Sequence, residues 1–289
     1  MSIHYWSALH SDLRHHLSSI RADWQALLGD DSNTEPVYQR FLQEHAGFFW
    51  ADGINCVVVL SQVRLGRDFV VDFVRASERG SQGFHYELIE IESPHEAPYN
   101  AQGRPGKRLA SALEQITDWR HWLAANTAEA KRVFPSKDFV FYDEPSFSYT
   151  VVTGRRVEND EQRRRRNRRA KELGVTIRSF DALTDWVTKR PYLDVFDSCA
   201  PECSRLPVEI RNALANPFNV SIGDSAWSRV VGSPTFASFH SVPLNADLLV
   251  SAWTQNERFS LFDSDWNALP VDRRAFFESA LQEAEALDR

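Results

Sequence analysis

The sequence predicts an α/β protein in which helices flank a mixed β-sheet. In several long segments, apolar residues recur every three or four positions, which is the period of an amphipathic helix. Between these segments lie short apolar runs bounded by glycine, proline or polar residues, as is typical of strands. Further along, a strand, an arginine-rich helix and a second strand follow one another. This order predicts a βαβ unit with two parallel strands.

The predicted elements follow in a simple order. A first helix is expected at about 4–28, and a second begins at Thr34-Glu35-Pro36, where threonine can cap and proline suits the first turn. Three strands come next, and a short polar link before the third predicts an antiparallel hairpin. These strands are expected at about 55–63, 68–75 and 84–92. The later elements are a helix at 107–126, strands near 138–142 and 147–155, a helix at 158–173, a strand at 175–178 and a helix at 180–187.

The last hundred residues have a different character. Seven prolines divide them into short apolar pieces, and only 270–287 has a convincing helical pattern. We therefore divide the chain into an N-terminal helix (1–33), a main domain (34–190) and an irregular C-terminal region (191–289) whose role the sequence does not predict.

Composition is that of a soluble globular protein, with 43% hydrophobic and 25% charged residues. No run of about 18 apolar residues is present, so no membrane partner is expected. The start lacks a basic segment followed by an apolar core, and three cysteines do not suggest a disulfide framework. We expect a cytoplasmic location. The net charge is -7, yet 151–190 is strongly basic, and local charge matters more than the total for steering a polyanion.

Acidic residues on neighbouring predicted strands are the main candidates for chemistry. Glu90 and Glu92 lie two apart and therefore point to the same face of their strand, while Asp72 lies on the preceding strand. Carboxylates gathered in this way can bind a divalent cation. Glu-x-Glu on a strand is common, however, and both glutamates could instead pair with lysines or arginines on a solvated face. The apolar neighbours Leu88, Ile89 and Ile91 favour a buried position, where a charge must be paired or bind a metal.

Together, these segments resemble the Shedu anti-phage defence family, a branch of the PD-(D/E)xK nuclease superfamily. The resemblance covers about 34–190 and depends on the order and spacing of its motifs. They are Phe41-Leu42-Gln43-Glu44-His45, Asp72-Phe73-Val74, Leu88-Ile89-Glu90-Ile91-Glu92-Ser93-Pro94, Ala112-Leu113-Glu114-Gln115-Ile116-Thr117-Asp118-Trp119, Val151-Val152-Thr153-Gly154-Arg155 and Phe180-Asp181-Ala182-Leu183.

The resemblance implies a restriction-endonuclease-like core with a mixed sheet flanked by helices. It implies that Asp72 and Glu90 hold Mg²⁺ or Mn²⁺, that Glu44 completes the metal site through water, and that Gln115 is the polar residue of the following helix. Glu92 departs from the pattern because it occupies the lysine position of (D/E)xK. Glutamate can bind metal or act as a base, but it offers no positive charge. Lys107 or Arg108 could supply that charge, or could simply face solvent.

An arginine run, Arg163-Arg164-Arg165-Arg166-Asn167-Arg168-Arg169, accounts for much of the basic segment. It has two interpretations. In the first, the helix is solvated and pairs with nearby acids or with the acidic C-terminal region. In the second, it contacts DNA phosphates or an acidic partner subunit. For the DNA interpretation, we name Arg164, Arg165, Arg168 and Lys107 as the contacts.

The leading functional hypothesis is a Mg²⁺-dependent DNA endonuclease of bacterial anti-phage defence, with Asp72, Glu90, Glu92 and Gln115 at its catalytic site. The resemblance also implies a homo-oligomer, and a phage-derived or defence-system protein is a further expected partner. Two alternatives stay open. One is a catalytically silent nuclease fold that binds DNA or protein, and the other is a structural subunit of a larger defence complex.

Overall fold

The computed structural model describes residues 13–50, 58–78, 84–100, 102–136, 145–156, 160–188 and 221–231, together with 271, 272 and 275. The strand expected near 138–142 lies outside these residues, as do the start of the first helix and nearly all of the helix expected at 270–287. The first residues of the strand expected at 55–63 and of the helix expected at 158–173 also lie outside them, and the other expected elements lie within them.

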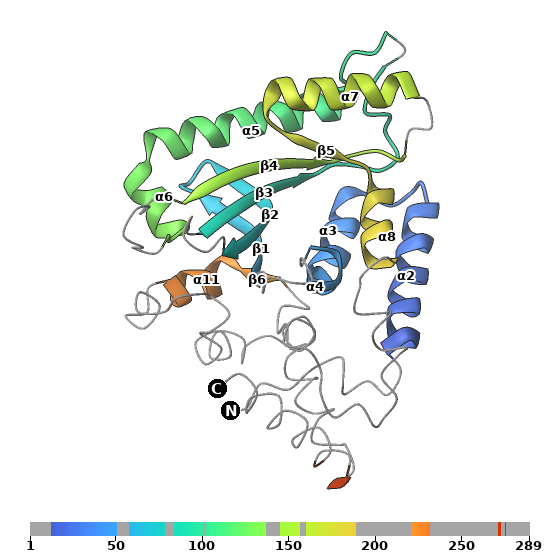
Figure 1. Ribbon diagram of the computed structural model, residues 1–289, viewed down its shortest axis with the longest axis horizontal. Helices are drawn as coiled ribbons and strands as arrows, with labels where there is room; N and C mark the ends of the chain where they lie inside the picture. Colours follow the sequence, from blue (N-terminus) through green and yellow to red (C-terminus); the bar gives the residue numbers. More distant parts are fainter. Residues whose placement is uncertain are drawn as a thin grey trace.

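The centre of the fold is a mixed sheet of six strands in the order β5-β4-β3-β2-β1-β6 (Figure 1). The strands are β1 (Val58–Leu65), β2 (Phe69–Glu78), β3 (Phe84–Ile91), β4 (Ser146–Val152), β5 (Thr176–Arg178) and β6 (Ile222–Gly223). The first three are antiparallel neighbours, whereas β4 and β5 continue from β3 in parallel. The predicted hairpin and the predicted βαβ unit are both confirmed.

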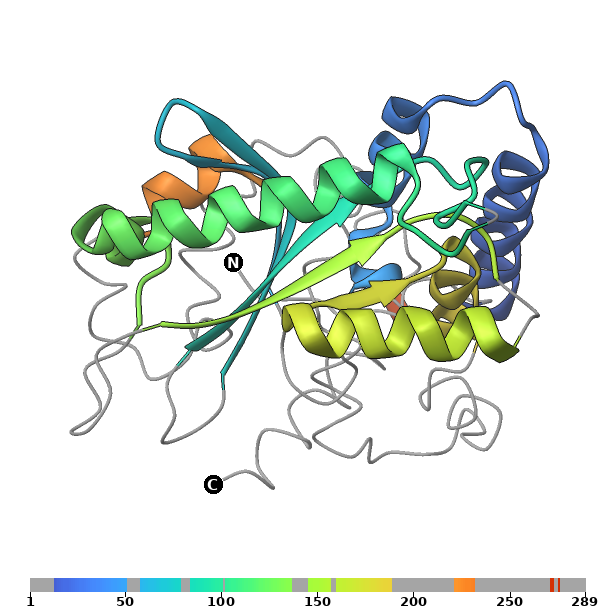
Figure 2. The ribbon, with the colours of Figure 1, turned by 90° about the horizontal axis from the view of Figure 1, so that it is seen from above.

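Helices flank the sheet on both sides (Figures 1 and 2). On one face lie α5 (Lys107–Ala125) and α7 (Asp160–Leu173). The other side carries α2 (Leu13–Gly29), α3 (Glu35–Glu44), α4 (Ala46–Phe49) and α8 (Phe180–Thr188). Two further helices, α6 (Thr127–Val133) and α11 (Asp224–Val231), lie near the β1–β6 side. The fold is therefore a mixed α/β sheet flanked by helices, as the sequence predicts.

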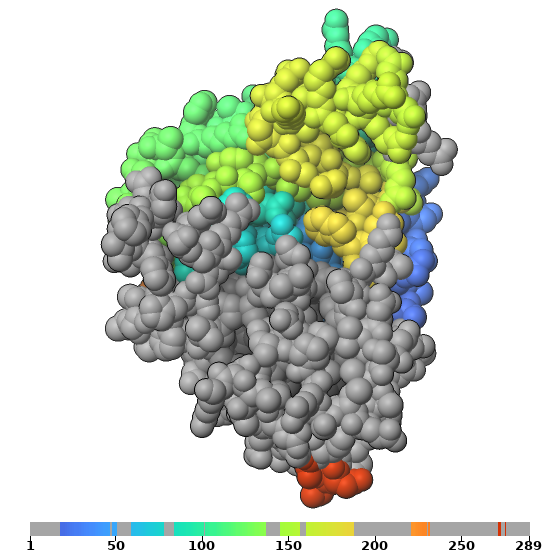
Figure 3. All heavy atoms as spheres, in the orientation of Figure 1, coloured from blue at the N-terminus to red at the C-terminus, as the bar shows by residue number. Residues whose placement is uncertain are grey.

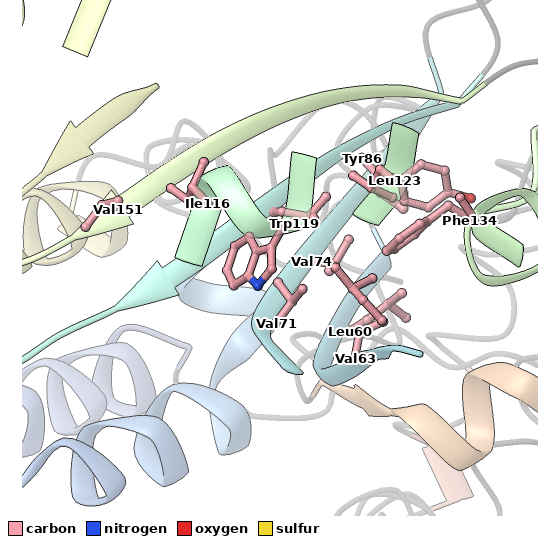
Figure 4. Packing of buried hydrophobic residues seen from close by; sticks show 14 of the residues in the cluster. Leu60, Val63, Val71, Val74, Tyr86, Ile116, Trp119, Leu123, Phe134 and Val151 are labelled. Atoms are coloured by element: carbon pink, nitrogen blue, oxygen red, sulfur yellow. The ribbon is translucent and has the colours of Figure 1, made fainter. Parts of the chain in front are cut away.

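The core between α5 and the sheet follows from the helical period of α5. Its buried residues are spaced three and four apart, so they form one apolar strip. They are Leu109, Ala112, Ile116, Trp119 and Leu123. This strip packs on strand residues that include Val74 and Val151 (Figure 4). The packing fixes α5 over the sheet and thereby sets where its first turn lies.

A second core of aromatic residues joins the helices of the opposite side. Trp24 of α2 is 1% exposed, and its ring contacts Tyr38, Phe41, Phe49 and Phe180 at centroid distances of 5.0 to 6.1 Å. Aromatic pairs at these separations add to the free energy of burial. This cluster ties α3 to α2 and α8 through Tyr38 and Phe41.

Part of the C-terminal region belongs to the same sheet. Leu60 and Ser61 of β1 pair with β6, and Trp227 of α11 is 1% exposed. The Trp227 indole N–H donates a hydrogen bond to the Val133 carbonyl at 2.8 Å. The sequence predicted neither β6 nor α11, because two strand residues and eight helical residues are too short to show a period. Among the described helices, none has both the length and the apolar composition of a membrane span.

A candidate active site where two strands separate

The candidate site lies where β2 and β3 part. Their ladder runs from Glu78↔Phe84 to Phe73↔Ile89, and beyond it the Asp72 side chain takes over the hydrogen bonding. Its Oδ2 accepts a hydrogen bond from the Ile91 N–H at 3.0 Å, and its Oδ1 accepts one from Gln62 Nε2 at 3.1 Å. These bonds fix the Asp72 carboxylate beside the end of β3.

Glu90 and Glu92 bring two more carboxyl groups to this point. Glu90 is opposite Val151 in the parallel ladder, and the Glu92 N–H donates to the Val152 carbonyl at 2.8 Å. Only 6% of Glu90 and 4% of Glu92 is exposed. The Oε2 atom of each is buried without a hydrogen-bond partner. A buried carboxylate oxygen without a partner is costly, and such a cost is expected at sites that bind a ligand.

Burial and mutual repulsion raise the pKa of all three groups. The pKa of Asp72 rises to about 6, chiefly by burial, although the Ile91 N–H acts in the opposite direction. The pKa of Glu90 rises to about 10, through burial and then through the charges of Asp72 and Glu92. Burial and Glu35 raise the pKa of Glu92 to about 7, against the opposing effect of Arg108. A fully ionised cluster would therefore hold more negative charge than its surroundings compensate, so the metal-free site favours protonated carboxyl groups.

Glu35, and not Glu44, is the glutamate of α3 that joins the cluster. Burial raises the pKa of Glu35, while the charge of Arg108 and then the neighbouring Glu92 carboxyl group act in the opposite direction. Glu44 is exposed at the other end of α3 and is not among the charges that shift the pKa values of the three acids. The two glutamates are nine positions apart, which corresponds to a rise of roughly 13 Å along the helix, so one helix cannot bring both to this point. The structure thus places Glu44 away from the three acids, and its role at the metal site stays a prediction.

Arg108, the second residue of α5, brings a positive charge to the cluster. Its Nε donates to Glu96 Oε1 at 3.0 Å, while its Nη1 lies 3.7 Å from Glu92 Oε2 and 3.9 Å from Glu35 Oε2. Among the described residues, Asp72, Glu90 and Glu92 make no ion pair with the arginines of α7. Of the two cations named from the sequence for this role, Arg108 lies at the carboxylates, and Lys107 makes no ion pair within the described ranges.

The loop after Glu92 is held tightly between β4 and α5. The Gly154 N–H donates to the Ser93 carbonyl at 3.1 Å, and the Gly106 N–H donates to the Pro98 carbonyl at 2.9 Å. Gly154 has φ +64, and a Cβ there would lie 2.7 Å from Pro98 Cδ. Only glycine suits a position that combines this backbone angle with so close a contact. This clamp holds Glu96 where it contacts Arg108.

The structure does not bring Gln115 to the carboxylates. It is half-buried beside the apolar strip of α5, and within the described ranges it makes no hydrogen bond to Asp72, Glu90 or Glu92. Nor does the described part of the chain contain three His, Cys, Asp or Glu side chains arranged to hold a metal ion together. Mg²⁺ usually takes only one or two protein carboxylates, with water and substrate phosphate completing its shell. Asp72 and Glu90 supply the donors that such a site needs.

The arginines of α7 divide into paired and unpaired groups. Arg163 pairs with Asp160, Arg165 with Glu161, and Arg169 with Glu172 along the helix. Arg164 and Arg168 are exposed and have no ion-pair partner in the described part of the chain. The atoms of α7 lie on the outer surface at the top of Figure 3. The solvated interpretation therefore fits Arg165, whereas Arg164 and Arg168 make no ion pair with the acids of the described ranges.

Comparison with known proteins identifies a family for this chain. The family model described as Shedu protein SduA, C-terminal, covers residues 32–184, more than half of the 289-residue chain. The chain belongs to the Shedu family. Membership suggests a role in anti-phage defence. No curated protein and no solved structure matches the chain. The matched residues include the whole carboxylate cluster, together with Arg108 and all of α7.

Sequence reasoning missed Glu35, Glu96 and Gln62. Glu35 had a signal, because it opens a helix just after Thr34 and before Pro36, but the motif drew attention to Glu44 instead. Gln62 carried no signal: it meets Asp72 through the strand register and has an unusual backbone angle of φ 52. Contacts of this kind depend on tertiary structure and cannot be found from spacing alone.

Proposed function

We propose that this Shedu protein hydrolyses phosphodiester bonds of DNA in anti-phage defence, at a PD-(D/E)xK-type site where Asp72 and Glu90 hold Mg²⁺ or Mn²⁺. The observation that carries the proposal is the meeting of buried carboxyl groups where β2 and β3 separate. Glu90 contributes a buried oxygen without a hydrogen-bond partner, which a cation would satisfy. Carboxylate oxygens are the ligands that these hard cations prefer.

The neighbouring side chains have distinct roles in the proposed reaction. The oxygen of a water forms a bond to phosphorus, one P–O ester bond breaks, and the products are a phosphate monoester and a hydroxyl group. Glu92 accepts the proton that the attacking water loses, and the departing oxygen takes a proton from solvent. The Ile91 N–H and Gln62 keep the Asp72 carboxylate in place. When bound, the divalent cation lowers the pKa of a coordinated water and neutralises charge on the phosphate.

The test is cleavage of supercoiled plasmid in Mg²⁺ and in Mn²⁺ by the wild type, Asp72→Asn and Glu90→Gln. Both variants remove a charge with little change of shape. We expect each to lose about a hundredfold or more in rate, because the cation stabilises transition-state charge, with the unfolding transition retained. Glu114→Gln is the matched control, because Glu114 is an exposed glutamate of α5. Equal rates in all four proteins would sink the assignment of the site.

A catalytically silent nuclease fold that binds DNA is the second candidate. The Glu92–Arg108 contact favours it, because the position of the motif lysine is occupied by an acid that a cation already faces at 3.7 Å. Thermal unfolding with increasing Mg²⁺ or Mn²⁺ separates the two functions. The enzyme is expected to be stabilised through Asp72 and Glu90, as a ligand specific to the native state would do. A silent module should show the same small salt effect in wild type and variants.

A further inference from the structure

We propose that Arg108 contacts the scissile phosphate and supplies the positive charge that Glu92, in the lysine position, does not offer. This inference rests on the proposed nuclease function. In that scheme the positive charge comes from Arg108 in the first turn of α5, whereas the motif lysine would have come from the end of β3. Glu96 is then the positioning residue that directs the guanidinium.

The geometry of Arg108 leaves donors for a substrate. Of its five N–H donors, the one on Nε is used in the 3.0 Å hydrogen bond to Glu96. The Nη1 atom is 3.7 Å from Glu92 and 3.9 Å from Glu35, which is beyond hydrogen-bonding distance in both cases. The guanidinium is thus held from one side and attracted toward the cluster, while its terminal nitrogens keep their donors.

Exposure gives the substrate access to those donors. The Arg108 side chain is 48% exposed, whereas the Glu92 side chain beside it is only 6% exposed. Arg108 is therefore open to solvent while it lies beside the buried Glu92, so a phosphate that reaches Glu92 is also within reach of this guanidinium. A planar guanidinium matches two phosphate oxygens at once, which gives orientation as well as charge.

The three glutamates around Arg108 keep its guanidinium charged and close to the carboxylate cluster. Three glutamates, Glu35, Glu92 and Glu96, lie within 3.0 to 3.9 Å of its guanidinium. A cation surrounded by this much negative charge remains protonated and stays at the cluster before DNA arrives. The clamped loop holds the backbone on both sides of Glu96, and the Glu96 carboxylate in turn holds the Arg108 guanidinium through the 3.0 Å hydrogen bond.

The experiment compares single-turnover cleavage by Arg108→Gln, Arg108→Lys, Arg108→Ala and Arg104→Gln at saturating Mg²⁺. Arg104 is the matched control, since it is an exposed arginine of the same loop whose side chain makes no ion pair among the described residues. We expect Arg108→Gln to lower the rate about a hundredfold or more, as does removal of other donors to a transition-state oxyanion. Arg108→Lys should recover part of the rate, and added guanidinium should partly restore Arg108→Ala. Arg104→Gln should stay within about threefold of wild type.

Two results overturn the inference while the nuclease function stands. One is Arg108→Gln within about threefold of a wild type that needs Asp72 and Glu90. The other is an equal loss in Arg108→Gln and Arg108→Lys with no recovery by guanidinium, which would assign Arg108 to packing. If no protein cleaves DNA, the nuclease function fails, and duplex binding in Ca²⁺ then tests the contact. Arg108→Gln should reduce the salt slope by about one, and an unchanged slope excludes a phosphate contact.

Discussion

Burial of the Glu90 carboxylate lowers the stability of the metal-free fold, and a bound cation would offset that cost. Burial raises its pKa to about 10 from an ordinary value of 4.5, so the native state holds a proton that the unfolded state has lost at neutral pH. Stability falls with pH wherever the native state binds more protons than the unfolded state. The metal-free protein should therefore become less stable as pH rises from about 4 to 8, and a bound cation should offset this loss.

The first prediction concerns Glu90→Gln without metal. At pH 8 this variant should be more stable than wild type by roughly 1–3 kcal/mol, since one pKa unit corresponds to about 1.4 kcal/mol. At pH 4, where the glutamate is protonated in both states, the difference should vanish. Urea unfolding in EDTA at the two pH values measures both. Glu114→Gln, the exposed control, should change little at either pH, and a less stable Glu90→Gln at pH 8 would contradict the argument.

The second prediction separates the two glutamates of α3. Glu35→Gln should lower Mg²⁺-dependent cleavage about tenfold, as supporting residues around a metal site do, because its charge acts on Glu92 and its Oε2 lies 3.9 Å from Arg108 Nη1. Glu44→Gln, the same substitution on the same helix, should leave the rate within about twofold of wild type. Initial rates on plasmid DNA provide the measurement. A larger loss in Glu44→Gln would restore the assignment made from the motif.

These residues show what sequence spacing can and cannot determine. Asp72, Glu90 and Glu92 were found because alternation along a strand and the apolar neighbours of Glu90 place them on paired strands. Glu35 and Glu96 escaped because their proximity depends on where a helix starts and how a loop is clamped. Spacing along one element predicted which side chains share a face, whereas contacts between elements required the packed structure.

At the scale of elements, helix α7 carries some arginines in ion pairs and others exposed to solvent without an ion pair in the described ranges. Three of its arginines pair with acids of the same helix, and pairs of this kind on a solvated helix contribute little to stability. The exposed Arg164 and Arg168 lack such partners in the described ranges, so their charge remains available to phosphates. Paired arginines could not be separated from free ones in the sequence, because seven consecutive positions point to most directions around a helix.

The third prediction tests this surface. Arg164→Ala with Arg168→Ala should weaken binding of duplex DNA and reduce the slope of log affinity against log salt by about two, one for each phosphate that the variant no longer neutralises. Arg21→Ala with Arg132→Ala removes the same charge from α2 and α6 and should leave the slope unchanged. Titrations between about 50 and 200 mM salt in Ca²⁺ give both slopes. Equal slopes in wild type and the α7 variant would show that Arg164 and Arg168 do not contact DNA phosphates.

At the scale of the whole molecule, apolar periodicity and the order of the elements predicted every described strand of the sheet except the edge strand β6. The longer helices and the three strands of the hairpin region were located from apolar periodicity. The parallel pairing of β4 and β5 followed from the strand–helix–strand rhythm, whereas the pairing of β3 with β4 was not predicted. The edge strand β6 and the short helices α4, α6 and α11 span two to eight residues, and segments of that length carry too few positions to show a period. Their placement comes from tertiary contacts alone.

The fourth prediction concerns whether residues 221–231 are part of the main cooperative unit. Trp227 is 1% exposed, packs with the α5 core and donates to the Val133 carbonyl, and Ser221 Oγ donates to Ser61 Oγ at 2.9 Å. Trp227→Ala should therefore destabilise the whole domain by about 3–5 kcal/mol, as buried tryptophans do elsewhere. Trp227→Phe, which keeps most of the volume but not the N–H donor, should cost less.

Chemical unfolding followed by circular dichroism measures these changes, and hydrogen exchange of β3 amides shows where they act. If 221–231 form one unit with the sheet, the single transition of the wild type shifts to lower denaturant in Trp227→Ala, and β3 amides lose protection equally. If the segment is merely attached, the main transition and β3 protection stay unchanged. In the first case, an edge strand far along the chain from β3 stabilises the strands that carry Asp72 and Glu90.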